Sequence, residues 1–161
     1  MARIAPAYIN GAIDILLRGD DTGEIGYLPS TLYLALLTAA PYTVSDQYLA
    51  FDTEDEVTYT GYARRSIARS LTGFRSTQGN TSASSGTTGT TSPAANQYFP
   101  LCTTSSEIVT HAALCVDNVR VSVENYVVCY WTLPRPMQLS NTSPGFYPCL
   151  FASALTIQLD D

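Results

Sequence analysis

Few side chains in this sequence are suited to catalysis. The 161 residues contain a single histidine, His111, and no lysine. A general base needs a nucleophile beside it and an acid that orients it, and the sequence has no G-x-S-x-G turn or Cys-His signature to supply them. It also lacks a phosphate-binding loop, a dinucleotide-binding glycine motif and an H-E-x-x-H zinc motif. We therefore expect a structural or interface role for His111 and no enzymatic activity.

Acidic and thiol side chains are the candidate metal ligands. Two acidic runs, at 20–24 and 52–56, do not match the spacing of ligands, turn glycine and closing glutamate in a calcium-binding loop. We expect solvated loops there, with a calcium-bridged subunit contact as the alternative. The cysteines are 13, 14 and 20 residues apart, whereas zinc ligands usually come in close pairs. No metal or cofactor is expected, and buried thiols in strands are predicted for Cys102, Cys115, Cys129 and Cys149.

The charge composition points to an assembly subunit. Only 14% of residues are charged, all eight basic residues are arginine, and the net charge is −6. This acidity disfavours binding to nucleic acid or to a membrane surface. The surface must consist largely of Ser, Thr, Asn, Gln and Tyr. Because arginine and aromatic residues are enriched at interface cores where lysine is depleted, we expect contacts with other subunits.

Two segments are candidates for those contacts. Arg64, Arg65 and Arg69 form either a solvated strand edge or an ion-pair cluster that reaches acids of a partner subunit, and we favour the second interpretation. Residues 76–95 are mostly Ser, Thr and Gly, a composition typical of a flexible loop or arm. Either its own domain or a neighbouring subunit would hold it, and we favour the neighbouring subunit. The predicted interface residues are Tyr62, Arg64, Arg65, Arg69, Gln78, Asn80 and Pro93.

The elements that would position these residues are mostly strands. Apolar residues recur at helical spacing over 8–18, before Gly19, which predicts one short N-terminal helix. A short apolar run at 31–38 ends at Ala39, Ala40 and Pro41 and predicts a buried strand. Further strands are predicted at 107–116, 119–123, 126–131 and 155–159, with breaks at Pro134, Pro136, Pro144, Gly145 and Pro148.

Together these patterns predict an all-β fold, an antiparallel β-sandwich of jelly-roll type with the N-terminal helix across one end or edge. The length favours a single domain over residues 1–161. The first residues carry no apolar run of signal-peptide character, so synthesis in the cytosol is expected. No apolar stretch approaches the length of a membrane span.

Five sequence blocks, in the same order, resemble a family of small virion proteins of tailed bacteriophages, whose members are often described as tail-fibre or minor structural proteins. The blocks are LYLALLTAAP at 32–41, Glu56 with GYAR at 61–64, YFP at 98–100, IVTHAAL at 108–114 and LTIQLD at 155–160. The resemblance covers nearly the whole chain and implies a structural protein of the virion, made in the cytoplasm of a bacterial host.

Two structural roles fit this resemblance. The favoured one is a capsid cement or decoration protein, a homotrimer over capsomer joints, which would stabilise the assembled head because it binds only the assembled state. Small size, acidity and the Ser/Thr/Gly arm favour it. The alternative is a tail-associated adaptor, fibre or minor tail protein. Partners would be further copies of the chain and the major capsid protein or tail proteins. A third role, a carbohydrate-binding module, has only the abundance of tyrosine and Trp131 in its favour, and strand aromatics more often fill cores.

Overall fold

The structure, a computed structural model, describes residue 17 and residues 29–45, 48–70, 72–75, 90–103, 106–118, 125–140 and 147–158. The chain divides into two compact units. Unit 1 comprises Met1–Thr31, Ile67–Asn96 and Phe151–Asp161, and unit 2 comprises Leu32–Ser66 and Gln97–Leu150. The expectation of one domain over residues 1–161 stays a prediction.

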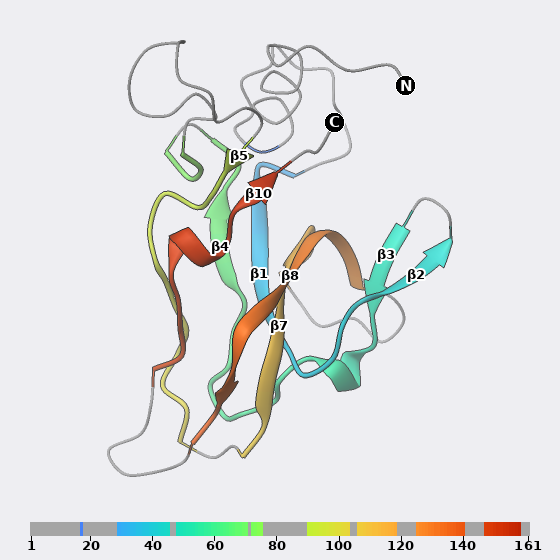
Figure 1. Cartoon of the computed structure of the whole chain (residues 1–161), viewed down its shortest axis with the longest axis vertical. Helices are drawn as coiled ribbons and strands as arrows, with labels where there is room; N and C mark the ends of the chain where they lie inside the picture. The colour runs from blue at the N-terminus through green and yellow to red at the C-terminus, as the bar shows by residue number, and fades with distance from the viewer. Residues whose placement is uncertain are drawn as a thin grey trace. The chain divides into compact units, whose positions relative to one another are not determined.

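The described residues form β-structure with short 3-10 turns (Figure 1). A six-stranded sheet has the order β2-β3-β8-β7-β1-β4, and two small sheets pair β10 with β5 and β6 with β9. The elements are β1 (Thr31–Leu37), β2 (Tyr42–Ser45), β3 (Tyr48–Phe51), η2 (Thr53–Asp55), β4 (Arg65–Ala68), β5 (Thr90–Thr91), β6 (Gln97–Tyr98), β7 (Ile108–Cys115), β8 (Asn125–Gln138), β9 (Cys149–Leu150), η3 (Ala152–Ala154) and β10 (Ile157–Gln158).

β1 and β7 form an antiparallel pair within the large sheet. Leu34 lies opposite Leu114 and Ala35 opposite Ala113, and all four side chains are fully buried. One face of the sheet packs a cluster made of Ala35, Leu37, Phe51, Ala113 and Cys115. Burial of each large apolar side chain contributes about 1.5–3 kcal/mol, so this region anchors unit 2. The predicted strand at 31–38 is confirmed, as is the one at 107–116.

β8 is longer than the sequence predicts and bends between its two partners. Its first residues pair with β3 and the rest with β7, and the bend is visible in Figure 1. Thr132 lies opposite His111 and Met137 opposite Val109, so residues 133–136 bulge opposite Thr110. A bulge frees proline from the ladder hydrogen bond that it cannot donate. The expectation that Pro134 and Pro136 separate short strands is therefore wrong.

Unit 1 contains the pair of β5 and β10, with Thr91 opposite Ile157. A turn after β4 leads back toward this pair, because Phe74 bridges Pro93. In this turn a Cβ atom on Gly73 would lie 1.8 Å from the carbonyl oxygen of Ala68, so no larger residue fits without movement of the backbone. The position therefore requires glycine on steric grounds.

Some expectations fall outside the described residues. The predicted helix at 8–18 is described only at Leu17, which is buried, and the strand predicted at 119–123 is not described. The antiparallel β-class is confirmed for the described part of the chain, while the sandwich stays a prediction. None of the helices in that part has the length and apolar character needed to cross a membrane.

Candidate functional site

A glutamate is brought into the interior of unit 2 beside the end of β1. After η2, the N–H of Thr38 donates to the oxygen of Asp55 (2.8 Å) and the N–H of Val57 donates to the oxygen of Leu36 (3.2 Å). Glu56 therefore bridges Leu37 as a short extension of the sheet. Its exposed fraction is only 1%. The expectation that the whole acidic run at 52–56 is a solvated loop is wrong for Glu56.

A tight turn returns the chain to this carboxylate. The N–H of Tyr62 donates to the oxygen of Tyr59 (3.0 Å), and Gly61 at the third position of the turn has φ of +84°. A type II turn requires a positive φ at this position, which glycine adopts without strain. The residues that follow, Tyr62 and Arg64, are thereby aimed back at Glu56.

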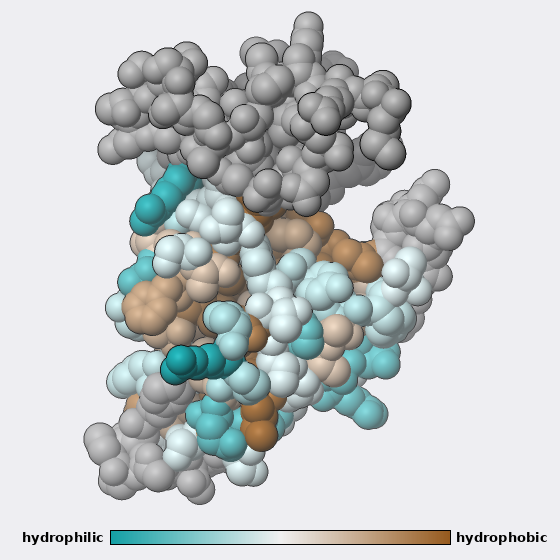
Figure 2. Space-filling view, viewed as in Figure 1, coloured by the Kyte–Doolittle hydropathy of each residue, from teal (hydrophilic) through white to brown (hydrophobic). Residues whose placement is uncertain are grey.

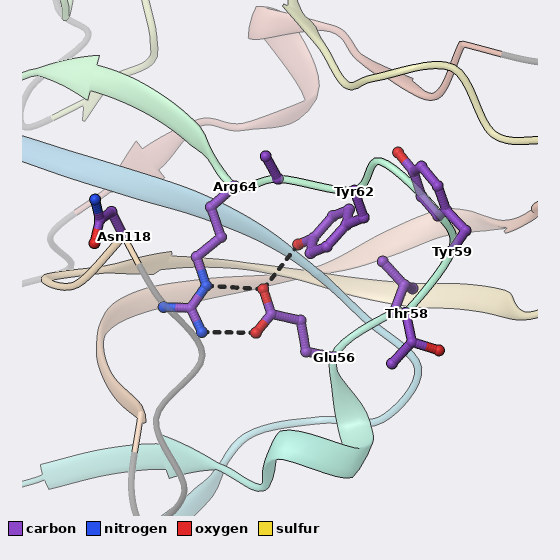
Figure 3. Close-up of a pocket in the computed structure, with 8 residues that line it drawn as sticks. Glu56, Thr58, Tyr59, Tyr62, Arg64 and Asn118 are labelled. Atoms are coloured by element: carbon purple, nitrogen blue, oxygen red, sulfur yellow. Dashed lines mark hydrogen bonds and ion pairs between the residues drawn. The ribbon is translucent and has the colours of Figure 1, made fainter.

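Glu56 and Arg64 form a buried, two-pronged ion pair (Figure 3). Nε of Arg64 donates to Oε1 of Glu56 (2.8 Å) and Nη2 donates to Oε2 (2.6 Å). Nη1 donates to the main-chain oxygen of Asp117 (2.8 Å), just after β7. The guanidinium carbon lies 5.5 Å from the centre of the Phe51 ring, within the range of a cation–π contact. The arginine thus ties three separate segments of unit 2 together.

The hydroxyl of Tyr62 completes this network. It donates to Oε1 of Glu56 (2.9 Å) and accepts the N–H of Leu36 (3.0 Å). The hydroxyl oxygen therefore takes the place of a strand carbonyl at this edge of β1. Because a buried N–H without a partner is costly, the contact stabilises the sheet as well as the ion pair.

Aromatic rings connect the network to β6. The Tyr62 ring lies edge-on to Tyr59, with centroids 5.3 Å apart, and is stacked with Phe99 at 6.1 Å. The hydroxyl of Tyr59 donates to the main-chain oxygen of Pro100 (2.9 Å). Both contacts hold the segment that follows β6 in a fixed position.

The surroundings fix the protonation states of the network. Burial alone would lower the pKa of Arg64, but the hydrogen bonds and charge of Glu56 outweigh it and raise that pKa. Burial and the nearby Glu56 carboxylate raise the pKa of Tyr62 well above its ordinary value. The guanidinium stays charged and the phenol stays neutral, as the hydrogen bonds require.

A pocket of about 260 Å³ lies over this network. It is lined by Glu56, Val57, Thr58, Tyr59, Tyr62, Ala63, Arg64 and Asn118 (Figure 3). Thr58, Ala63 and Asn118 are exposed, so the pocket opens to solvent. The charged atoms of Glu56 and Arg64 that face the pocket bind one another, so the network holds segments of the chain in place.

Comparison with known proteins identifies the family. The sequence model for the podophage GP4 fiber I protein gp80 matches residues 7–120, more than half of the chain. The chain belongs to this family. No curated protein sequence matches it. The matched span includes Glu56, Tyr62, Arg64 and Phe99, and therefore the whole network.

Membership of this fibre family supports a structural protein of the phage virion, as the five sequence blocks predict. It also supports localisation to the virion. It does not support the favoured expectation of a capsid cement protein, and it agrees better with the tail-associated alternative.

The predicted interface residues of this fibre-family chain have different surroundings. Tyr62 and Arg64 belong to the buried network, so the acid that Arg64 meets is Glu56 of its own chain rather than one on a partner. Pro93 is buried in unit 1 opposite Phe74. The role of Tyr62, Arg64 and Pro93 in an interface with a partner stays a prediction.

The other predicted interface residues remain untested. Arg65 is exposed, and Arg69 is half-buried with its N–H donating to the oxygen of Ser30 (2.8 Å). Gln78 and Asn80 lie outside the described residues. The interpretation of Arg65, Arg69, Gln78 and Asn80 as interface residues stays a prediction.

His111 and Cys115 lie on β7, Cys129 lies on β8 and Cys149 lies on β9, whereas Cys102 lies outside the named strands. Oγ1 of Thr110 donates its hydrogen to the oxygen of Thr38 (2.7 Å), so Nδ1 of His111, at 2.8 Å, is the donor to Oγ1. Burial lowers the pKa of His111. All four cysteines are free; Cys102 and Cys115 are buried, and Cys129 and Cys149 are half-buried.

Proposed function

We propose that this protein is a structural component of a podophage tail, a fibre or fibre-base subunit that works by binding other virion proteins. The observation that carries the proposal is the fibre-family match over residues 7–120. The protein would be made in the cytoplasm of the bacterial host and would need neither an enzymatic activity nor a cofactor to do this work.

The site geometry supports a structural role. Glu56, Tyr62 and Arg64 use their polar atoms to join the end of β1, the loop after β7 and the segment after η2. A buried charged pair that is fully hydrogen-bonded fixes one arrangement of these segments. A rigid scaffold of this kind suits a subunit that must present the same surface in every copy.

The expected partners are further copies of the chain and tail proteins. Soluble oligomers of identical subunits usually have closed symmetry, and a homotrimer is the closed form that we propose. The sparse charge of the sequence supports protein contacts, because charged residues are depleted at interface cores.

The copy number per virion tests this function. Purified virions would be analysed by quantitative mass spectrometry against isotope-labelled peptides of this chain, with the major capsid protein as the internal standard. A tail role predicts a handful of copies that stay with tails when tails are separated from heads. Hundreds of copies that stay with tail-less heads would contradict the tail role and would favour the role of a capsid cement protein.

A further inference from the structure

The paired strands β6 and β9 have two different faces. Tyr98 lies opposite Cys149 and Gln97 opposite Leu150, and the N–H of Phe99 donates to the oxygen of Pro148 (2.8 Å). Residues opposite each other in an antiparallel pair share a face, and successive residues alternate. Phe99, Pro148 and Leu150 are buried and so mark the inner face.

The outer face of this ribbon carries exposed tyrosines. Tyr98 is 57% exposed and Tyr147, two residues before Cys149 and therefore on the same face, is 61% exposed. Cys149 lies half-buried beside them. Tyrosine is one of the residue types enriched at binding hot spots, so two exposed tyrosines on one face of a strand pair are a candidate binding surface.

The same surface is built from the parts of the chain that carry no charge. No acidic or basic residue occurs between Arg75 and Glu107 or between Arg135 and Asp160. β6 lies in the first of these stretches and β9 in the second, and the two stretches pair with each other. In the space-filling view, hydrophobic side chains reach the surface among pale and hydrophilic ones (Figure 2).

The buried network holds this ribbon from its inner side. Phe99 stacks with Tyr62, and Tyr59 binds the oxygen of Pro100. The tyrosines of the outer face therefore lie on a backbone that is already ordered. This backbone loses little conformational entropy when a partner binds.

We propose that the outer face of the β6–β9 ribbon, centred on Tyr98 and Tyr147, binds a second copy of this chain. The inference rests on the proposed function in requiring an assembled subunit, and it names the surface through which copies meet. Two copies that each carry a net charge of −6 repel one another. They approach at least cost through a face without carboxylates, where aromatic contacts supply the attraction.

Charge variants of the two tyrosines test the proposal. Sedimentation velocity over a concentration series would compare the wild-type chain with Tyr98→Asp/Tyr147→Asp, because two carboxylates would then be buried in each contact. We expect an oligomer for the wild type and a rise in its dissociation constant of at least about thirtyfold for the double variant. The matched control is Tyr130→Asp, since Tyr130 is a 40% exposed tyrosine on β8. This control should associate like the wild type.

Salt separates this contact from one made by arginines. An uncharged contact between acidic copies should persist or strengthen in about 1 M NaCl, where repulsion is screened, whereas an ion-pair contact through Arg65 would weaken. Circular dichroism and the melting temperature would show that the variants are folded, and Tyr98→Ser/Tyr147→Ser replaces the aspartate pair if that pair unfolds.

A wild-type chain that is monomeric at tens of micromolar would overturn the proposal. This holds even if the double variant loses binding to another tail protein or to a cell-surface polysaccharide, because the face would then bind that partner and not a second copy. An oligomer that the tyrosine substitutions leave unchanged would also overturn it. Neither result alters the copy number per virion, so the failure of this inference is distinguishable from the failure of the proposed tail function.

Discussion

At the scale of single residues, the Glu56–Arg64 pair is the most consequential feature of the chain. Removing two charges from water costs several kcal/mol for each ion, and the two-pronged geometry with Tyr62 and Asp117 offsets that cost. A buried pair of this kind contributes little net stability compared with apolar residues of the same size. Removal of only one of the two charged side chains is strongly destabilising, because the other charge stays buried without a partner.

The first prediction follows from this asymmetry. Arg64→Met should lower the free energy of unfolding by about 3–5 kcal/mol, because it leaves the Glu56 carboxylate buried without its partner. The double variant Glu56→Leu/Arg64→Met should be at least as stable as the single variant. Urea denaturation of the three proteins measures both values, and a double variant less stable than Arg64→Met would contradict the argument.

The Tyr62 hydroxyl gives the second prediction. Tyr62→Phe should cost about 1–3 kcal/mol, since the N–H of Leu36 loses its acceptor in a buried position. The matched control is Tyr130→Phe, an exposed ring whose hydroxyl makes no contact with the network, and it should change stability by less than about 0.5 kcal/mol. Equal effects of the two substitutions would show that the hydroxyl has no role at the edge of β1.

The third prediction concerns pH. Burial lowers the pKa of His111 in the folded chain, so the unfolded chain binds a proton first as the pH falls. The neutral ring then contributes stability that is complete above the unfolded pKa of about 6.5 and is lost as the pH falls through the lower folded value. His111→Asn retains a donor near Nδ1 without titrating. Between pH 7.5 and 5.5 the wild type should lose more stability than this variant, and parallel curves would refute the assignment.

Tyr62 and Arg64 could be singled out from the sequence, but it could not be predicted that both side chains point into the interior. The spacing in Gly61-Tyr62-Ala63-Arg64 singles out a tyrosine and an arginine on one face of an extended segment. A charged residue is by default assigned to the surface, and only the bridge between Leu37 and Glu56 places a carboxylate inside to receive it. That contact joins the end of one strand to a later loop, which local sequence patterns do not encode.

At the scale of elements, two glycines control the turns that return the chain to its sheet. Gly73 lies so close to the Ala68 carbonyl that a Cβ would meet backbone at 1.8 Å, whereas Gly61 has open space but a φ of +84°. The two positions therefore resist substitution for different reasons, one steric and one conformational.

These reasons give the fourth prediction. Gly61→Ala should lower the free energy of unfolding by about 1–2 kcal/mol, the usual cost of a left-handed backbone for a residue with a Cβ. Gly73→Ala should cost more, because the backbone itself must move. Thermal denaturation with Gly61→Asn as a control, which tolerates positive φ better, would rank the variants. A Gly73→Ala protein as stable as the wild type would contradict the steric argument.

Elements with strong local patterns could be predicted, and those set by long-range pairing could not. The apolar runs of β1 and β7 are visible in the sequence and occur where expected. β8 continues through Pro134 and Pro136 because Thr132 and Met137 keep their partners on β7 while the residues between them bulge. The sequence marks those prolines as breaks, since nothing local indicates that a neighbouring strand will hold both sides.

At the scale of the whole molecule, the charge distribution connects the fold to its proposed use. The two stretches without charge come from distant parts of the sequence, and β6 and β9 bring them together with Tyr98 and Tyr147 outward. The low proportion of charged residues can be read from the composition, and it indicates a subunit that contacts other proteins. Which surface collects the uncharged residues depends on strand pairing and could not be predicted from composition.

The proposed tail function depends most on the position of the protein in the virion. Electron microscopy of virions labelled with gold-conjugated antibody against the purified chain would locate it directly. Membership of the podophage fibre family predicts label confined to the tail vertex. Label spread over the whole surface of the head would contradict a tail-associated structural role.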